Sequence, residues 1–399
     1  MVSIPERSPL IRVAFTLIGG KNWTGGYNYL LNLLQALAIH QSEAITPVLF
    51  VPIDGETDFT PFAALPGVEV VRSELLNART RKTQLLQALL WGRVPAVERL
   101  FAQRRIDVVF EAAQFFGWRL DIPAIAWIPD FQHKAMPSFF SNAARCKREI
   151  GFRAQVSSGR FIMLSSDDAR EACERHYPAS RARTRTVHFA VPQGPQAGYS
   201  EVRAVADRYD LPANFIFMPN QFWQHKNHML VLDALDILRA RGAEIVVAAS
   251  GKQLDPRAPR YFDSFERTVK DRGLGSSMRL LGMIPYAHLS ALMRCCQAML
   301  NPSLFEGWST TVEEARALAT PMLLSDLDVH REQMGTNARY FNRHSAQALA
   351  DLIQSTPPFD IHSRELALSH ARHNAEVRVR DFAADFTRLV PDAVSARST

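Results

Sequence analysis

Two glutamates late in the chain stand eight positions apart, in a setting suited to binding a sugar and a phosphate. In the stretch SLFEGWSTTVEEARALATP (residues 303–321), Glu306 precedes an expected helix and Glu314 lies one turn inside it. Gly307 allows a sharp turn that leaves amides of the first helical turn facing outward as an anion site. Carboxylates accept charge-assisted hydrogen bonds from hydroxyls, so Glu306 is a candidate to hold a sugar and Glu314 a ribose diol.

The helical half of this pattern also has a structural explanation. Thr311 and Glu314 match the S/T-x-x-E spacing of a capping box. Glu313 and Glu314 would also favour the positive end of the helix dipole. Taken alone, the part of the stretch from Thr311 to Glu314 favours this capping interpretation over ligand binding.

A lysine and a glycine loop follow two other expected strands. Lys226, in PNQFWQHKNH after a strand at 215–218, can reach a pyrophosphate as a point charge, although an exposed turn lysine is the commoner case. The loop GGKNWTGG (19–26), after a strand at 12–18, would bring amides near a phosphate at a helix start. Its spacing is not GxGxxG, so a dinucleotide fingerprint is absent, and such glycines are as often structural.

These loops belong to an alternation of short β-branched runs and helical patterns that predicts parallel α/β units. We expect two doubly wound, Rossmann-like domains. Open α/β sheets bind ligands at the carboxyl ends of their strands, so the active site is expected in the cleft between the domains. The expected strands are RVAFTLI, VLFV, VEVV, IDVVF, IAWI, FIML and TVHF in the first domain, and FIFM, IVVAA, RLL, AML and PMLL in the second.

The domain boundary is expected near Pro192, where a linker rich in Pro, Gly and Gln precedes a helix and a new first strand. The domains are then 1–192 and 193–375. Residues 376–399 are expected to form a helix that returns to the N-terminal domain. Apolar residues recur along it at spacings of three and four, at Val379, Phe382, Phe386 and Leu389.

Composition narrows the class of protein. With 399 residues, 47% hydrophobic and 22% charged, the chain is that of a soluble globular protein. No apolar run approaches the ~18 residues of a spanning helix, and no secretion signal is visible. The cysteines have no metal-ligand spacing, which favours a reduced, cytoplasmic protein without structural zinc; they are Cys146, Cys173, Cys295 and Cys296.

The net charge of +6 lies entirely in the first half of the chain. Residues 1–190 carry 23 Lys and Arg against 17 Asp and Glu, and the remainder is balanced. The basic stretch from Arg79 to Arg105 would favour an anionic partner such as a phospholipid surface or a lipid-linked phosphate. A solvated basic helix face is an equal alternative, and nucleic acid is disfavoured because the aromatic residues are not interleaved with this basic stretch as stacking platforms would be.

Taken together, the Glu-x7-Glu element, the turn lysine and the stretch from Leu280 to Asp326 resemble the retaining glycosyltransferases of family 4, of the bacterial surface-polysaccharide type. The resemblance covers most of the second domain and, more weakly, the N-terminal glycine loop. It implies the α/β GT-B fold, with an acceptor-side N-terminal domain and a sugar-nucleotide-binding C-terminal domain. It also implies a GDP-, UDP- or dTDP-linked sugar as co-substrate, and no other cofactor.

The resemblance also assigns roles to individual residues. Glu314 would hold the nucleotide ribose, Glu306 the donor-sugar hydroxyls and Lys226 the diphosphate. Catalytic roles are expected for Glu306, Lys226 and Asp130. The donor-binding set is Gly25, Gly26, Gln221, Lys226, Gly282, Met283, Glu306, Gly307, Trp308, Ser309, Thr310, Thr311 and Glu314.

The chain departs from the family pattern in two places. Gln221 stands where an arginine is common, five residues before the lysine, so Lys252, Lys21 or an arginine would have to compensate. In IAWIPDFQHKAMPSFF, Asp130 aligns with the family aspartate, but Pro129 replaces the usual histidine. His133 is a possible substitute, although a turn histidine is more often exposed.

The expected reaction is transfer of a hexose to a saccharide or lipid-linked saccharide with retention, at the inner face of the cytoplasmic membrane. A helix N-terminus and Lys226 can stabilise the leaving phosphate without a metal. Asp326-Leu-Asp328 has the DxD form of metal-dependent transferases but lies in the wrong kind of fold for that role. Alternatives are a sugar-nucleotide epimerase or phosphorylase of the same fold, or a non-catalytic sugar-nucleotide-binding scaffold; no lysine site for pyridoxal phosphate is evident, which disfavours the phosphorylase.

Overall fold

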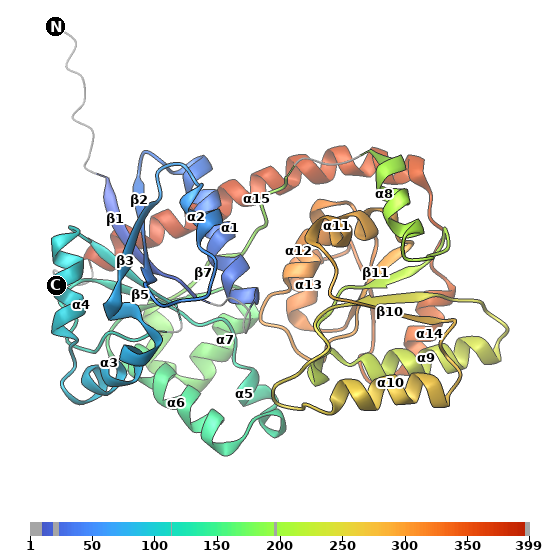
Figure 1. Cartoon of the computed structure of the whole chain (residues 1–399), viewed down its shortest axis with the longest axis horizontal. Helices are drawn as coiled ribbons and strands as arrows, with labels where there is room; N and C mark the ends of the chain where they lie inside the picture. The colour runs from blue at the N-terminus through green and yellow to red at the C-terminus, as the bar shows by residue number, and fades with distance from the viewer. Residues whose placement is uncertain (1–9, 19–23, 113, 195–197, 396–399) are drawn as a thin grey trace, which may run out of the picture. The chain divides into compact units, whose positions relative to one another are not determined.

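The computed structural model describes residues 10–18, 24–112, 114–194 and 198–395. These residues form two units, each built on its own sheet (Figure 1). Unit 1 comprises Met1–Phe131, Ser141–Pro192 and Val377–Thr399. Unit 2 comprises Gln132–Phe140 and Gln193–Glu376, so a short segment from within the expected first domain groups with the second unit.

Unit 1 contains a seven-stranded parallel sheet in the order β3-β2-β1-β4-β5-β6-β7. The central strands β4 to β6 are buried at every residue, as expected for a parallel sheet covered on both faces. The strands are β1 (Ile11–Thr16), β2 (Ile45–Pro52), β3 (Glu69–Ser73), β4 (Val108–Ala112), β5 (Ala124–Trp127), β6 (Phe161–Leu164) and β7 (Thr184–Thr186).

Helices connect these parallel strands, because a parallel pair needs a crossover. Helix α7 shows why one begins where it does: the hydroxyl of its N-cap residue Ser166 accepts a hydrogen bond from the Ala169 amide. The helices of unit 1 are α1 (Thr24–His40), α2 (Thr60–Ala63), α3 (Ala78–Leu90), α4 (Pro95–Gln103), α6 (Asn142–Ser157) and α7 (Asp167–His176), with 3-10 turns η1 (Glu74–Leu76) and η3 (Pro178–Arg183).

Unit 2 contains a six-stranded parallel sheet in the order β10-β9-β8-β11-β12-β13. Its strand order reverses direction between β8 and β11, and in open α/β sheets such a switch point is where ligands bind. The strands are β8 (Ile216–Met218), β9 (Val247–Ser250), β10 (Met278–Gly282), β11 (Ala298–Asn301), β12 (Met322–Ser325) and β13 (Arg339–Phe341).

Both faces of this sheet are covered by helices. In β8, Ile216 and Met218 pack into a core with α9 and α14, whereas Phe217 packs with α8, α11 and α12 on the other face. This alternation is that of a doubly wound sheet. The helices of unit 2 are α5 (Gln132–Ala135), α8 (Tyr199–Asp207), α9 (His228–Ala240), α10 (Tyr261–Asp271), α11 (Tyr286–Cys295), α12 (Thr310–Ala317), α13 (Asp328–Met334) and α14 (Ala346–Gln354), with 3-10 turns η2 (Pro137–Phe139) and η4 (Gln224–Lys226).

The helix α15 (Ile361–Ser395) begins in unit 2 and ends in unit 1. Its later half buries the apolar residues expected from their spacing. The Phe386 ring lies 5.8 Å from that of Phe15 and 5.6 Å from that of Phe110, and Phe382 packs against Tyr29. These strand and helix residues of unit 1 therefore share one aromatic core with the end of α15.

Two strand expectations were wrong. The seventh strand is Thr184–Thr186 rather than 186–189, because the run TVHF continues past the edge of the sheet as a buried loop. Strand β13 was not expected, since it is three residues long and begins with the exposed Arg339. Short edge strands need little apolar sequence, so hydrophobic patterning does not detect them.

Candidate functional site

The carboxyl end of β11 and the loop that follows it form the centre of the site in unit 2. Asn301 ends the strand and Ser309 is the N-cap residue of α12, with Glu306 between them. All three residues are buried. The strand and the helix therefore fix both ends of the loop that carries the first glutamate.

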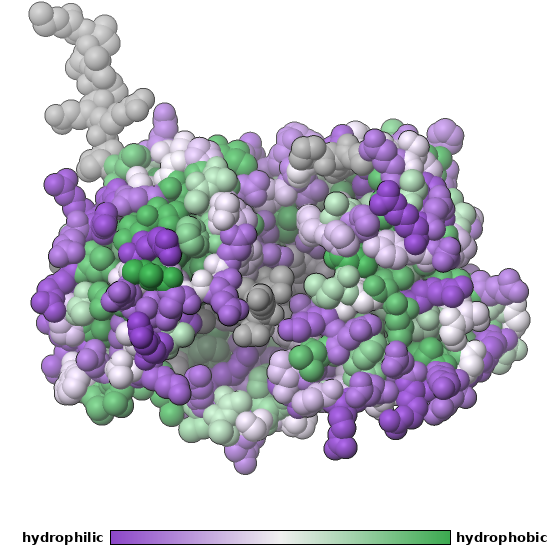
Figure 2. Space-filling model, viewed as in Figure 1, coloured by the Kyte–Doolittle hydropathy of each residue, from purple (hydrophilic) through white to green (hydrophobic). Residues whose placement is uncertain are grey.

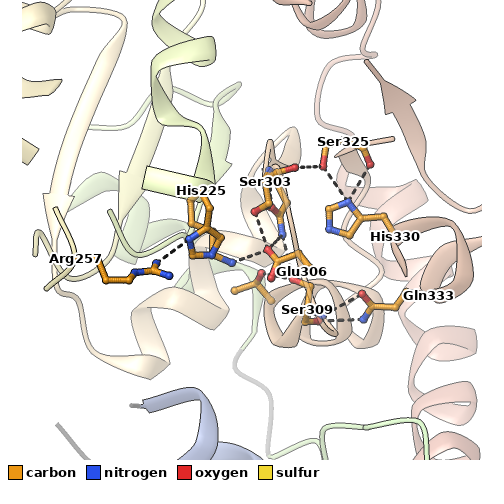
Figure 3. A network of polar contacts seen from close by, with 11 residues as sticks. His225, Arg257, Ser303, Glu306, Ser309, Ser325, His330 and Gln333 are labelled. Atoms are coloured by element: carbon orange, nitrogen blue, oxygen red, sulfur yellow. Dashed lines mark hydrogen bonds and ion pairs between the residues drawn. The ribbon is translucent and has the colours of Figure 1, made fainter. Parts of the chain in front are cut away.

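Glu306 is held by three side chains (Figure 3). Lys226 Nζ lies 2.6 Å from Glu306 Oε1, and the Ser303 hydroxyl lies 2.7 Å from the same oxygen. The Asn301 amide Nδ2 is 3.3 Å away. Each hydrogen bond from the described residues to this carboxylate ends on Oε1, so Oε2 has no hydrogen-bond partner among them.

The ion pair determines the charge of Glu306. Burial would raise its pKa, but the Lys226 ammonium beside it brings the pKa of Glu306 to about 2. The carboxylate is therefore ionised throughout the physiological range. An ionised carboxylate accepts hydrogen bonds only, so it would bind hydroxyl donors.

The first turn of α12 is fixed by Gln333 of α13. Ser309 N–H donates to Gln333 Oε1 (3.1 Å), and Gln333 Nε2 donates back to the Ser309 carbonyl (3.1 Å). The Ser309 amide therefore already has a hydrogen-bond acceptor within the protein. The amides of Thr310, Thr311 and Val312, in the first turn of α12, lack intrahelical carbonyl partners and are the ones suited to an anion.

The capping-box alternative is wrong. The helix begins at Thr310 with Ser309 as N-cap, so Thr311 is the second helical residue and cannot cap it. No side chain caps this helix by a hydrogen bond at the N-cap position. Glu314 therefore has no capping role.

Glu314 is the fifth residue of α12 and is buried. Burial raises its pKa to about 7, although a hydrogen bond with the Tyr286 hydroxyl of α11 acts in the opposite direction. The group consequently changes charge near neutrality. Glu306 and Glu314 are thus two carboxylates of one loop and helix with very different proton affinities.

His330 extends the network beneath Glu306. Its Nδ1 lies 2.9 Å from the Ser325 carbonyl, which can only accept, so Nδ1 carries the proton. Burial lowers the pKa of His330, so the ring is neutral and Nε2 has a lone pair. Among the described residues Nε2 has no hydrogen-bond partner. Ser325 also donates to the Ser303 carbonyl at 2.7 Å, which joins the ends of β12 and β11.

Arg257 makes a second polar cluster beside Lys226 (Figure 3). Its guanidinium donates to Asp255 Oδ1 at 3.2 Å, to Gln132 Oε1 at 2.9 Å and to His225 Nδ1 at 3.1 Å. Burial and the neighbouring Lys226 charge lower the pKa of His225 well below its ordinary range, so the ring is neutral and accepts this bond. The neutral His225 ring is therefore next to two cations, Arg257 and Lys226.

The turn after β8 is shaped by a close backbone approach. Gly251, after β9, has φ +149°, and a Cβ at this position would lie 2.5 Å from the Asn220 carbonyl oxygen. Gln221 follows directly, at the carboxyl end of β8. Gly282 ends β10 with φ +64° and Met283 beside it is exposed. Thus Gln221, Lys226, Gly282, Met283 and the residues from Glu306 to Glu314 all follow strand ends of one sheet.

The expected residues of unit 1 lie at two strand ends of the other sheet. Gly25 and Gly26 are in the first turn of α1, whereas Gly19, Gly20 and Lys21 fall outside the described residues. Asp130 follows β5 and pairs with Arg148 at 3.2 Å. The exposed-turn alternative for His133 is wrong, because that residue is buried in α5.

The DxD motif is occupied by other contacts. Asp326 Oδ1 lies 3.3 Å from Arg343 Nη1 and accepts from the Arg343 amide at 3.2 Å. Asp328 is the first residue of α13. Asp326 is therefore held by Arg343, and Asp328 lies in the first turn of a helix.

Residues 207–356 match the family model described as glycosyl transferases group 1. The matched residues all lie within unit 2. Over 258 residues, 63% of this chain, the sequence is 22% identical to the serotype-specific mannosyltransferase WbdA of Escherichia coli. This chain spans only 29% of that relative's length.

Solved structures show the same fold. The Anabaena protein Alr3699/HepE, in complex with UDP and glucose, aligns with a TM-score of 0.68 at 15% identity, over 95% of this chain and 98% of that one. WaaG, a glycosyltransferase involved in lipopolysaccharide biosynthesis, aligns with a TM-score of 0.55 at 13% identity, over 97% and 99%. The chain has the two-domain α/β GT-B fold. Among the described helices, none is long and apolar enough to cross a membrane.

Sequence reasoning missed several residues of the network. Asn301 and Ser325 end neighbouring strands. Polar residues at adjacent strand ends are a signal by which the sequence could have identified them. His330 and Gln333 lie on α13, after the next strand, and no spacing pattern connects them to Glu306. Arg257 is a single arginine in a polar loop, which gives no signal.

Proposed function

We propose that this protein is a retaining glycosyltransferase that moves a hexose from a GDP-, UDP- or dTDP-linked donor to a saccharide or lipid-linked saccharide, in surface polysaccharide synthesis at the cytoplasmic face of the membrane. The observation that carries the proposal is the ion pair between the partly buried Lys226 and the buried, ionised Glu306. It lies at the loop leading into α12, the helix that also carries Glu314. The group 1 domain and the similarity to a mannosyltransferase support it.

In this proposal each donor group meets a matching protein group. Sugar hydroxyls donate to Oε2 of Glu306, and the ribose diol donates to the Glu314 carboxylate. Lys226 carries three N–H donors, one of which is directed at Glu306, so the others can bind diphosphate oxygens. Amides at the start of α12 complete the phosphate site. Gly282 and Met283 face the base.

The proposed chemistry is front-face substitution at the anomeric carbon. The bond from that carbon to the diphosphate oxygen breaks, and a bond to the acceptor oxygen forms on the same face. The acceptor proton passes to the departing phosphate. Lys226 and the α12 amides stabilise the charge that develops on the phosphate, and these fixed charges need no reorganisation during the reaction. Asp130 of unit 1 and the amides of Gly25 and Gly26 are proposed to contact the donor.

A thermal-shift panel of sugar nucleotides tests donor binding. A true donor at ~100 times its dissociation constant adds about 2.7 kcal/mol of stability. We expect one sugar nucleotide to stabilise the protein more than its nucleoside diphosphate does. Glu306→Gln should remove that extra stabilisation, and Glu266→Gln, at an exposed position on α10, should not.

Product analysis with the identified donor then distinguishes the reactions. Transfer predicts nucleoside diphosphate release that depends on an acceptor, and a product with the anomeric configuration of the donor by NMR. An epimerised sugar nucleotide formed without acceptor would assign the protein to the epimerases. If the protein binds the sugar nucleotide but releases no nucleoside diphosphate with any extract offered as acceptor, it is a non-catalytic binding scaffold. A product with inverted anomeric configuration would refute retention.

A further inference from the structure

The outer face of α3 in unit 1 presents leucines to solvent. Leu86 is 57% exposed and Leu90 is 64% exposed. They follow Arg79 and Lys82 at spacings of three and four residues, so these four side chains share one face of the helix. Ala88 lies on the opposite face and is buried in the core of unit 1. The helix thus packs through one side and leaves an apolar and basic side uncovered.

Two tryptophans extend this surface. Trp91 is the C-cap residue of α3 and is 64% exposed, and Trp118 is 45% exposed. The two segments are in contact, because a Cβ on Gly92 would lie 2.4 Å from Trp118 Nε1, and the Arg119 amide donates to the Gly92 carbonyl at 2.7 Å. Gly92 has φ +76°, so glycine suits both the turn and the close approach. Trp118 therefore continues the apolar surface of α3.

Cations without acidic partners surround the apolar residues. Among the described residues, no ion pair involves Arg79, Lys82 or Arg119, and all three are exposed. Arg93 is different, because it pairs with Glu98 and Asp121. Glu74, in the turn before α3, is the exposed acidic residue nearest in sequence to the helix. Figure 2 shows hydrophobic and hydrophilic residues lying side by side over α3.

We infer that this surface, made of Arg79, Lys82, Leu86, Leu90, Trp91, Trp118 and Arg119 and called here the α3 face, docks on an anionic phospholipid bilayer. Leucines reach the acyl boundary, tryptophans sit at the level of the headgroups, and the long basic side chains reach anionic phosphates. Each Lys or Arg near such a surface adds roughly fivefold in affinity. A protein partner would explain the leucines, but unpaired cations around them match a surface of uniform negative charge.

Co-sedimentation with vesicles tests this inference on the full chain. One set of vesicles contains phosphatidylcholine with phosphatidylglycerol, and the other contains phosphatidylcholine alone. We expect binding to the anionic set, and at least ~tenfold weaker binding to the neutral set or in high salt. Equal binding to both sets, or no binding to either, would overturn the inference.

Matched variants show whether the α3 face is responsible. Leu86→Ser with Leu90→Ser removes apolar contact, and Arg79→Glu with Lys82→Glu reverses charge; both should reduce anionic-vesicle binding by ~tenfold or more. Leu366→Ser and Arg267→Glu change an exposed leucine on α15 and an exposed arginine on α10, and should bind like the wild type. Circular dichroism checks folding of every variant.

The alternative occupants give different results. If the α3 face joins two copies of the chain, light scattering without lipid will show a dimer that the leucine variants convert to a monomer, and the inference fails. If the control variants lose binding as much as the α3 variants, attraction is distributed over the molecule and the inference also fails. The inference bears on the membrane location given in the proposed function, but none of these outcomes depends on donor binding or turnover, so its failure can be distinguished from failure of the proposed transfer reaction.

Discussion

At the scale of single residues, Lys226 and Glu306 depend on each other. Moving either charge out of water is costly, and the attraction between them offsets the cost only while both are present. The low pKa of Glu306, about 2, reflects that attraction. Both groups are therefore charged in the folded protein. A bound diphosphate would compete with the Glu306 carboxylate for the Lys226 ammonium.

Removing one charge should therefore cost more than removing both. Lys226→Met leaves an ionised, buried Glu306 without its counter-charge, and we expect a loss of about 3–5 kcal/mol in the free energy of unfolding. Adding Glu306→Gln should recover a large part of this loss. Urea unfolding of the two single variants and the double variant measures the coupling. If the losses simply add, the pair does not stabilise the site.

Glu314 predicts a dependence of stability on pH. Its folded pKa of about 7 lies above its ordinary value of 4.5, so the folded protein binds this proton more tightly than the unfolded chain. The contribution is fully present below pH 4.5 and is lost as pH rises through 7. We expect Glu314→Gln to gain about 3 kcal/mol relative to the wild type between pH 5 and pH 8.

Denaturant unfolding at several pH values measures this difference. Glu266→Gln serves as the control, because it removes an exposed carboxylate from the same unit. A wild type and a Glu314→Gln variant with parallel pH profiles would contradict the assigned burial of this carboxyl group.

The sequence identified Lys226 and Glu306 but not the residues that hold them in place. Lys226 and Glu306 stand out because each follows a strand and has an evident chemistry. Asn301 and Ser303 are common polar residues whose role depends on which atoms they face. Ser303 shows this clearly: its one hydroxyl proton lies between Asn301 Oδ1 at 2.6 Å and Glu306 Oε1 at 2.7 Å, and only coordinates reveal that choice.

At the scale of elements, the strands were predictable because parallel strands are buried on both faces and read as continuous apolar runs. Strands β4 to β6 and β8 to β12 lie within a few residues of their expected positions. Helix starts were less predictable. Ser309 is the N-cap residue of α12 although Thr311 has the capping-box spacing, since Gln333 of α13 fixes the backbone of Ser309 through a contact distant in sequence.

The turn after β8 gives a prediction about backbone geometry. Gly251→Ala places a Cβ 2.5 Å from the Asn220 carbonyl oxygen and in a backbone conformation that side chains disfavour, so the turn carrying Gln221 must shift. We expect unit 2 to lose about 1–3 kcal/mol of stability and the binding of nucleoside diphosphate to weaken.

Gly275→Ala is the matched control, because no atom lies within 4 Å of a Cβ added there. Its melting temperature and nucleotide affinity should stay near those of the wild type. A Gly251→Ala protein that matches Gly275→Ala in both measurements would show that the close approach has no consequence.

At the scale of the whole molecule, α15 connects the two units covalently and contributes to the core of each. Leu368 and Ala375 are buried in its first part, and Phe382 and Phe386 in its second. The apolar spacing in the sequence predicted a buried helix there. It did not predict a single helix of 35 residues, because periodicity alone does not show which side of a long helix each unit covers.

Phe386→Ala should therefore destabilise unit 1, although residue 386 lies beyond all of unit 2 in the sequence. Truncating a buried phenylalanine costs about 3–5 kcal/mol, since its contacts with Phe15 and Phe110 leave a cavity. Leu366→Ala, on the same helix at 71% exposure, should cost less than about 0.5 kcal/mol. Chemical unfolding followed by tryptophan fluorescence compares the two, and equal losses would contradict the packing.

This division of α15 affects the order in which the chain acquires structure during translation. A ribosome makes the strands of unit 1 first, then the segment Gln193–Glu376 of unit 2, and only afterwards the segment from Val377 that covers Phe15 and Phe110. A nascent unit 1 must wait, with part of its interior open to solvent, while some 180 intervening residues are synthesised, which takes about 10–40 s at ordinary elongation rates. Apolar side chains such as Phe15 and Phe110 would be exposed to aggregation during that interval.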